Sequence, residues 1–220
     1  MLKLKAFVHI VESPSSADLL DGRTEGRVLS EALRLAGIPY SYNLAVDKAA
    51  LEESIGPRLD AAAKACGKLP ILHLSMHGDE YGVGLTSGEH LHWDDLRTML
   101  MPLMRKMNGG LLISMSSCFG ASGCRMAMYS GNDPHFWALV GNTGNAAWAD
   151  AAIAYVSFYH LFFKGIPLET CVHSMCVASG DTNFQHFDGA KTKAGWDAFV
   201  ASNPPLIPSV PPLPAAATKV

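Results

Sequence analysis

Two stretches of the sequence decide the fold: residues 71–78, ILHLSMHG, and residues 111–120, LLISMSSCFG. Each contains a short apolar run of the kind that forms a strand buried on both faces of a sheet. The first stretch ends in His77 and Gly78, and the second carries Cys118 just beyond its apolar run. Neighbouring strands of a sheet lie about 4.8 Å apart. If these two strands are parallel neighbours, His77 and Cys118 project at the same rim.

Further short apolar runs and helical patterns alternate along the rest of the chain, which is typical of a parallel sheet with helices on both faces. The expected strands are residues 4–11, 40–46 and 136–141, and the expected helices are residues 24–36, 94–107, 147–163 and 168–178. A helical stretch after Asp47 is expected to split or kink at Pro57, and residues 82–92 are expected to form a small hairpin or a loop.

Residues 1–202 are expected to form one domain, because a chain of 220 residues falls near the usual size of a single domain. Residues 203–220 hold six of the thirteen prolines, so we expect an extended or disordered tail there.

The composition excludes several classes of protein. With 49% hydrophobic and 17% charged residues, the chain can bury a large core and is not disordered as a whole. A net charge of -3 gives no basic field of the kind that nucleic-acid binders carry. No apolar stretch reaches the ~20 residues that span a membrane. Five cysteines without regular spacing fit a reducing compartment better than a disulfide scaffold. The sequence therefore predicts a soluble cytoplasmic protein.

A histidine and a cysteine at adjacent strand ends are the minimum apparatus of a cysteine hydrolase. The imidazole of His77 can take the thiol proton of Cys118 and return it to a leaving amine. The N–H groups of Gly78 and Cys118 could together form an oxyanion hole. Taken alone, a free cysteine is more often an inert buried residue, and a histidine at a strand end is often merely hydrogen-bonded. The occurrence of both at two such ends favours catalysis.

These residues resemble those of the caspase-like cysteine peptidases of clan CD. In the bacterial CHAT-type branch, the cysteine strand typically ends in Ser-Ala-Cys followed by a glycine, and residues 116–120, SSCFG, are similar. The resemblance implies an α/β fold, a caspase-like three-layer sandwich with a mostly parallel central sheet and helices on both faces. It also implies that His77 is the base and acid, that Cys118 is the nucleophile, and that Gly78 contributes to the oxyanion hole.

What the resemblance implies for function is a cysteine endopeptidase that cleaves a specific protein substrate through a Cys-His dyad. Such an enzyme needs no metal or organic cofactor. Bacterial members often act in antiviral defence or regulated cell death by cutting one dedicated target, for example a pore-forming or other effector protein. The substrate and the oligomeric state stay open.

Ser116, Trp137 and Asp150 are the candidate residues of the substrate pocket. Relatives with an acidic pocket carry an aspartate two residues before the cysteine, where this chain has Ser116. We therefore expect a neutral residue, small or aliphatic, before the scissile bond, while Asp79 and Glu80 could instead favour a basic one. The glycines and serines of residues 119–135 predict a mobile active-site loop.

Two alternatives remain open. His77 and Glu80 are spaced like the zinc-binding His-Gly-x-Glu motif of metallocarboxypeptidases, which would make the protein a zinc-dependent hydrolase. That family also needs an Asn-Arg segment, which this sequence lacks. The other alternative is a catalytically inactive caspase-like module that only binds a partner. His73 shares the strand face of His77 and either supports it or is a satisfied core histidine.

Overall fold

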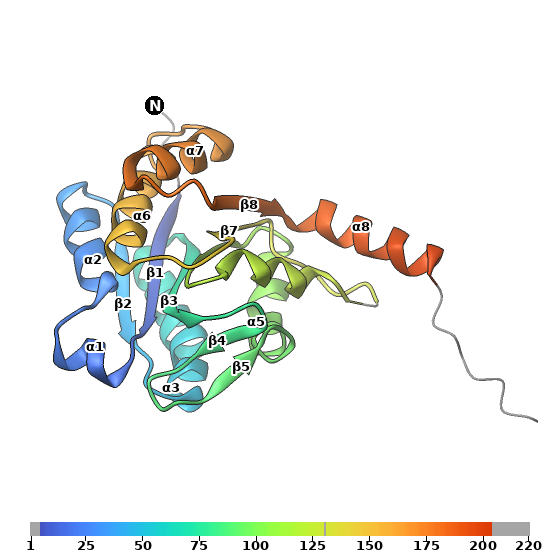
Figure 1. Ribbon diagram of the computed structural model, residues 1–220, viewed down its shortest axis with the longest axis horizontal. Helices are drawn as coiled ribbons and strands as arrows, with labels where there is room; N and C mark the ends of the chain where they lie inside the picture. Colours follow the sequence, from blue (N-terminus) through green and yellow to red (C-terminus); the bar gives the residue numbers. More distant parts are fainter. Residues whose placement is uncertain (1–4, 130, 204–220) are drawn as a thin grey trace, which may run out of the picture.

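The computed structural model describes residues 5–129 and 131–203, and its centre is one mixed sheet (Figure 1). The main strands stand in the order β2-β1-β3-β6-β7-β8. Their bounds are β1 Ala6–Ser13, β2 Tyr40–Leu44, β3 Leu69–Gly78, β6 Leu112–Ser116, β7 Ala138–Asn142 and β8 Phe184–Asp188. All neighbours pair in parallel except β7 and β8. The mostly parallel sheet is thus confirmed, and the two strands that end near His77 and Cys118 are adjacent.

Helices cover both faces of the sheet and complete the three predicted layers. One face carries α2 (Glu25–Leu35), α6 (Trp148–Phe162) and α7 (Leu168–Ser179). The other carries α3 (Lys48–Glu53), a π-helical turn η1 (Ser54–Arg58), α4 (Leu59–Cys66) and α5 (Trp93–Met107). Pro57 lies in the π-helical turn, where a residue without an N–H interrupts the regular helix as expected.

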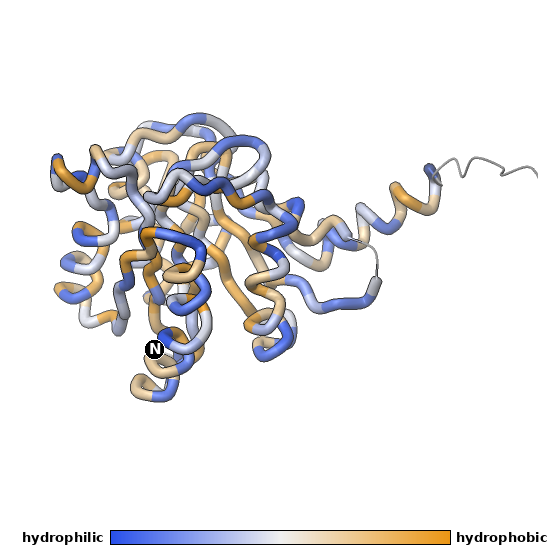
Figure 2. The backbone as a smooth tube through the Cα atoms, turned by 90° about the horizontal axis from the view of Figure 1, so that it is seen from below, coloured by the Kyte–Doolittle hydropathy of each residue, from blue (hydrophilic) through white to orange (hydrophobic). Residues whose placement is uncertain are grey.

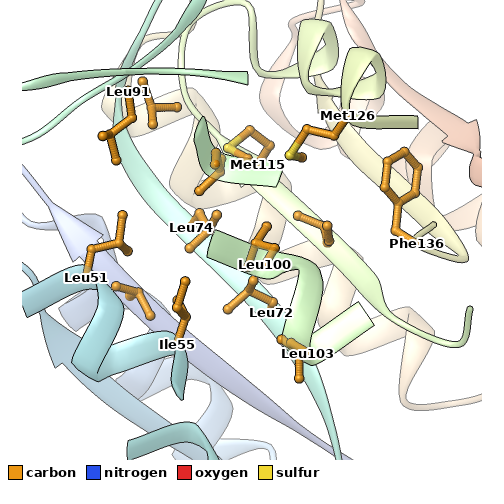
Figure 3. Packing of buried hydrophobic residues seen from close by; sticks show 14 of the residues in the cluster. Leu51, Ile55, Leu72, Leu74, Leu91, Leu100, Leu103, Met115, Met126 and Phe136 are labelled. Atoms are coloured by element: carbon orange, nitrogen blue, oxygen red, sulfur yellow. The ribbon is translucent and has the colours of Figure 1, made fainter. Parts of the chain in front are cut away.

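The alternation of side chains along β3 separates the apolar core from the polar residues of the site. Leu72, Leu74 and Met76 point toward α5 and join the large cluster drawn in part in Figure 3. Because successive side chains of a strand point to opposite faces, His73, Ser75 and His77 point the other way, toward α2 and α6. Figure 2 shows the hydrophobic strands in the interior and the hydrophilic stretches mainly in the connections.

Several elements do not appear in the sequence prediction. A short helix α1 (Ser16–Leu20) follows β1, and β8 leads into α8 (Gly189–Ser202), which projects from the body of the molecule (Figure 1).

The predicted hairpin is present as β4 (Gly82–Gly84) and β5 (His90–His92), attached to the end of β3.

The predicted mobile loop over residues 119–135 is wrong for residues 120–127. Residues Gly120–Ala127 form a 3₁₀ helix, η2, that packs against β7, and Cys124 within it is buried. Glycine serves here for close packing, because a Cβ on Gly120 would lie 2.5 Å from the carbonyl oxygen of Met115. Ser130 and, apart from Asn203, the predicted tail lie outside the described residues.

Within the described ranges, no helix has both the length and the apolar character needed to cross a membrane.

Candidate active site

The candidate site lies at the carboxyl ends of β3 and β6, next to the point where the order of strands reverses. From β1 the chain leads to β2 on one side and then to β3 and β6 on the other, and such a switch point is the usual binding crevice of α/β sheets. Ser75 of β3 pairs with Ser116 of β6, and His77 and Cys118 each follow two residues later. The structure brings these two together, because both line one cleft of about 160 Å³.

The imidazole of His77 is held on two sides. Its Nε2 lies 2.8 Å from Oδ2 of Asp18, and its ring packs edge-on against the indole of Trp148 at 5.3 Å between centroids. A carboxylate only accepts hydrogen bonds, so Nε2 carries the proton and donates it to Asp18. Nδ1 is then the unprotonated nitrogen, which is the form that a general base needs.

Asp18 is the residue of the site that the sequence analysis does not predict. It lies in α1, directly after β1, and its carboxylate accepts hydrogen bonds from the Ser15 hydroxyl at 2.6 Å and from His77. The Ser15 bond, with a further contribution from His77, holds the pKa of Asp18 below its ordinary value. The spacing Ser15-x-x-Asp18 just after a strand is a capping pattern that could have marked this acid.

Cys118 stands at a sharp turn. Phe119, which follows it, has a φ of 53°, a left-handed conformation that is uncommon outside glycine and recurs at functional sites. The turn is closed by the N–H of Gly120, which donates to the carbonyl of Ser117 at 3.1 Å. The sulfur accepts a hydrogen bond from the N–H of Ala146 at 3.4 Å and lies 3.8 Å from the carbonyl oxygen of the same residue, to which the thiol can donate.

Gly78 approaches the turn of Cys118 more closely than any side chain would allow. A Cβ at this position would lie 2.8 Å from the carbonyl oxygen of Cys118. The N–H of Asp79 bonds to Gly82 on the hairpin side, so the N–H of Gly78, one residue earlier, points to the opposite side, where β6 lies. The N–H of Cys118 has no backbone partner among the described residues. The amide of Cys118, a residue that lines the cleft, is thus available to an anion there.

No model of a known protein family matches the sequence, and neither does any curated protein. Solved structures match its fold. The crystal structure of the Arg-specific cysteine proteinase gingipain R (RgpB) has a TM-score of 0.52 at 13% identity, covering 84% of this chain and 46% of that one. The complex of the pro- and mature domains of RgpB from Porphyromonas gingivalis has a TM-score of 0.51 at 13% identity, covering 82% and 46%.

The chain has the gingipain fold. The predicted caspase-like sandwich is therefore confirmed as a fold. The chain spans less than half the length of the gingipain chains it matches. At this low identity the likeness concerns the fold alone, so the chemistry of the site rests on the chain's own residues.

The three predicted pocket residues are placed differently. Ser116 lines the cleft, and its hydroxyl donates to the buried carboxylate of Glu25. Trp137 lies before β7, at the opposite end of the strands, where it lines a separate hollow with Leu69. Asp150 lies in the first turn of α6 and does not line the cleft. Ala146 and Trp148 line the cleft instead of Trp137 and Asp150.

The other polar residues near the site have partners of their own. Asp79 accepts the N–H groups of Tyr81 and Gly82 and lies 3.2 Å from His90. Glu80 is exposed, and its side chain makes no hydrogen bond among the described residues. In residues 5–129 and 131–203, no three histidine, cysteine or acidic side chains gather as they would around a metal ion.

His73 is a buried core histidine on the strand face of His77. Its Nδ1 lies 3.1 Å from the Tyr159 hydroxyl, and its ring packs edge-on against Tyr155.

Proposed function

We propose that the protein is a cysteine peptidase in which Cys118 is the nucleophile and His77 the general base and acid. The observation that carries the proposal is the shared cleft, which is lined both by the Cys118 residue and by His77, whose imidazole is oriented by the Asp18 carboxylate. Nucleophile, base and orienting carboxylate are the three groups of an activated covalent catalyst.

The geometry supports the following sequence of steps. Nδ1 of His77 takes the thiol proton, and the sulfur of Cys118 attacks the carbonyl carbon of the scissile peptide bond. The oxyanion that forms accepts hydrogen bonds from the N–H groups of Gly78 and Cys118. His77 then gives its proton to the leaving amine, and water, deprotonated by the same imidazole, releases the acid product from the thioester.

Asp18 acts through His77. By accepting a hydrogen bond from the N–H at Nε2, the carboxylate keeps Nδ1 unprotonated and holds the ring toward the cleft. It also stabilises the imidazolium that exists between the two proton transfers. Its lowered pKa keeps Asp18 ionised at neutral pH, which both roles need.

The substrate class that we propose is a protein cleaved within its chain, bound as an extended segment at the carboxyl edge of the sheet. Membership in the CHAT-type branch, a location in the cytoplasm, and cleavage of one effector in antiviral defence or regulated cell death stay predictions from the sequence.

The test is cleavage of a peptide library derived from a proteome digest, read by mass spectrometry. Three proteins are compared: the unaltered protein, Cys118→Ala, and Cys66→Ala as a control for removal of a thiol in α4. The proposal expects new peptide termini with the first and third proteins and none with Cys118→Ala. Equal cleavage by Cys118→Ala, or no cleavage by any of the three, contradicts it.

A further inference from the structure

A buried carboxylate lies directly beneath the candidate catalytic residues. Glu25 is the first residue of α2, and its side chain is completely buried. Its Oε2 accepts two short hydrogen bonds, each of 2.7 Å, one from the hydroxyl of Ser75 and one from the hydroxyl of Ser116. One oxygen atom thus joins the two neighbouring strands β3 and β6.

Ser75 and Ser116 lie on the two strands that carry the candidate catalytic residues, close to where those strands end. They are register partners in the sheet, and each stands two residues before a candidate catalytic residue, His77 or Cys118. Because side chains two residues apart on a strand share a face, the serine hydroxyls lie on the side from which His77 projects. The bridge therefore fixes the two strands one step below the thiol and the imidazole.

The surroundings show that this bridge is more than packing. Burying a carboxylate is costly unless it is paired or hydrogen-bonded, and an apolar side chain would fill the space without that cost. The charged and titratable groups near Glu25 come from three elements: His73 of β3, with Nε2 at 3.6 Å from Oε1, Glu12 of β1, and Tyr155 and Tyr159 of α6. Neither Oε1 of Glu25 nor Nε2 of His73 has a hydrogen-bond partner among the described residues.

Charge-assisted bonds are stronger than neutral ones, and here no water competes for them. Among the described residues, the hydrogen bonds of the Glu25 side chain are those to the two strands that carry the candidate catalytic residues. Replacing either serine leaves the carboxylate with one bond fewer and releases one strand from the bridge.

We propose that Glu25 is a positioning residue that fixes the separation of His77 and Cys118 by binding Ser75 and Ser116. The inference rests on the proposed function for its effect on turnover, since a displacement of about 1 Å can cost about 100-fold in rate. Its effect on the reactivity of Cys118 toward a small alkylating reagent does not depend on that function.

The test uses Ser75→Ala, Ser116→Ala and the pair Glu25→Ala and Glu25→Gln. Ser114→Ala is the matched control, because Ser114 is a buried serine of the same strand and face as Ser116 that bonds to Tyr159 and not to Glu25. Ser75→Ala is the cleaner of the two serine variants, since Ser75 does not line the cleft. For each protein we measure kcat and KM on a cleaved peptide, the rate constant for alkylation of Cys118 by iodoacetamide, and the melting temperature.

The bridge predicts a fall in kcat of about 10-fold for Ser75→Ala, with KM changed by less than about twofold, and slower alkylation of Cys118. Glu25→Gln, which can still accept hydrogen bonds, should recover most of the activity that Glu25→Ala loses. In the Glu25→Ala background, Ser75→Ala should cost no further activity, because the two residues act as a unit.

A purely structural role gives a different pattern. Ser75→Ala, Ser116→Ala and Ser114→Ala would then lower the melting temperature alike and leave kcat and the alkylation rate unchanged, which would overturn the inference. If Glu25→Ala does not fold, the serine variants and Glu25→Gln decide. If the unaltered protein cleaves no peptide, the proposed function fails, and the alkylation rates alone test the bridge: slowing by Ser75→Ala but not by Ser114→Ala supports it, and equal rates contradict it.

Discussion

Replacing Asp18 by asparagine removes the charge that orients His77, while the size and shape of the side chain stay almost the same. The variant keeps the backbone N–H that donates to Ser15, so the start of α1 should persist. Its amide group can present either an acceptor or a donor to Nε2 of His77. Where it presents the donor, the proton moves to Nδ1 and the base is lost.

The size of the effect follows from the exposure of the pair. A buried aspartate in a Ser-His-Asp triad contributes about 10⁴-fold to kcat. The side chain of His77 is 49% exposed, so water can replace part of the lost interaction, and the edge contact with Trp148 still restrains the ring. We therefore expect kcat/KM to fall by about 10- to 100-fold, which corresponds to about 1.4–2.7 kcal/mol of transition-state stabilisation.

The assay is steady-state hydrolysis of a peptide selected from the library, with Asp21→Asn as the control. Asp21 is an exposed aspartate at the end of the same helix, paired with Arg23 and not with His77. The control should keep its activity within about twofold. If Asp18→Asn also stays within twofold, the carboxylate does not orient the base, and this part of the mechanism is refuted.

Three further predictions follow from the same structure. Iodoacetamide should label Cys118 before Cys171, because burial raises the pKa of the Cys171 thiol to about 11; peptide mapping that finds Cys171 labelled first would contradict the assignment of the nucleophile. The cleft of about 160 Å³ should accept a small neutral residue before the scissile bond, and a peptide panel that shows preference for Arg or Lys would contradict this. Burial raises the pKa of Glu12 above its ordinary value of 4.5, so its contribution to stability is present below pH 4.5 and is lost as the pH rises through the raised pKa. The melting temperature of Glu12→Gln should therefore rise relative to that of the unaltered protein as the pH is raised from 4 to 8. A difference in melting temperature between the two proteins that stays constant over this range would contradict the raised pKa.

The sequence predicts the central strands well because their signal is local. The runs that become β3 and β6 are short, largely apolar and bounded by polar or glycine residues, so their existence follows from the pattern. Their adjacency was only a condition of the argument, and the pairing in the structure supplies it. By contrast, β8 has the sequence FQHFD and pairs antiparallel at the edge of the sheet, so it contains no apolar run to mark it. Its formation depends on pairing with β7, a tertiary contact.

The candidate site is predictable only in part for a similar reason. His77 and Cys118 lie at strand ends, where position along the strand predicts position in space. Asp18 and Glu25 reach the site from α1 and from the start of α2, both after β1, and nothing in their local sequence shows the direction in which the chain turns. The placement of Trp137 was open to correction from the sequence itself, because Trp137 stands at the beginning of the expected strand 136–141, and the amino end of a strand lies away from the crevice.

The glycines after Cys118 show a limit of composition as a guide. A segment rich in glycine and serine is compatible with a mobile loop and equally with a tightly packed turn. In η2, Gly120 and Gly123 allow the backbone to approach Met115 and Leu139 closely, so the segment is ordered and largely buried. Only the tertiary contacts distinguish the two cases.

The measurement that tests the central claim most directly is the hydrolysis rate of one library-derived peptide by four proteins: the unaltered chain, His77→Ala, Cys118→Ala and the double variant. Groups that act as one catalytic unit lose activity together rather than additively. The account predicts that each single variant is reduced to the same residual rate as the double variant. A Cys118→Ala protein that still cleaves the peptide at the unaltered rate, or two losses that simply add in the double variant, would contradict it.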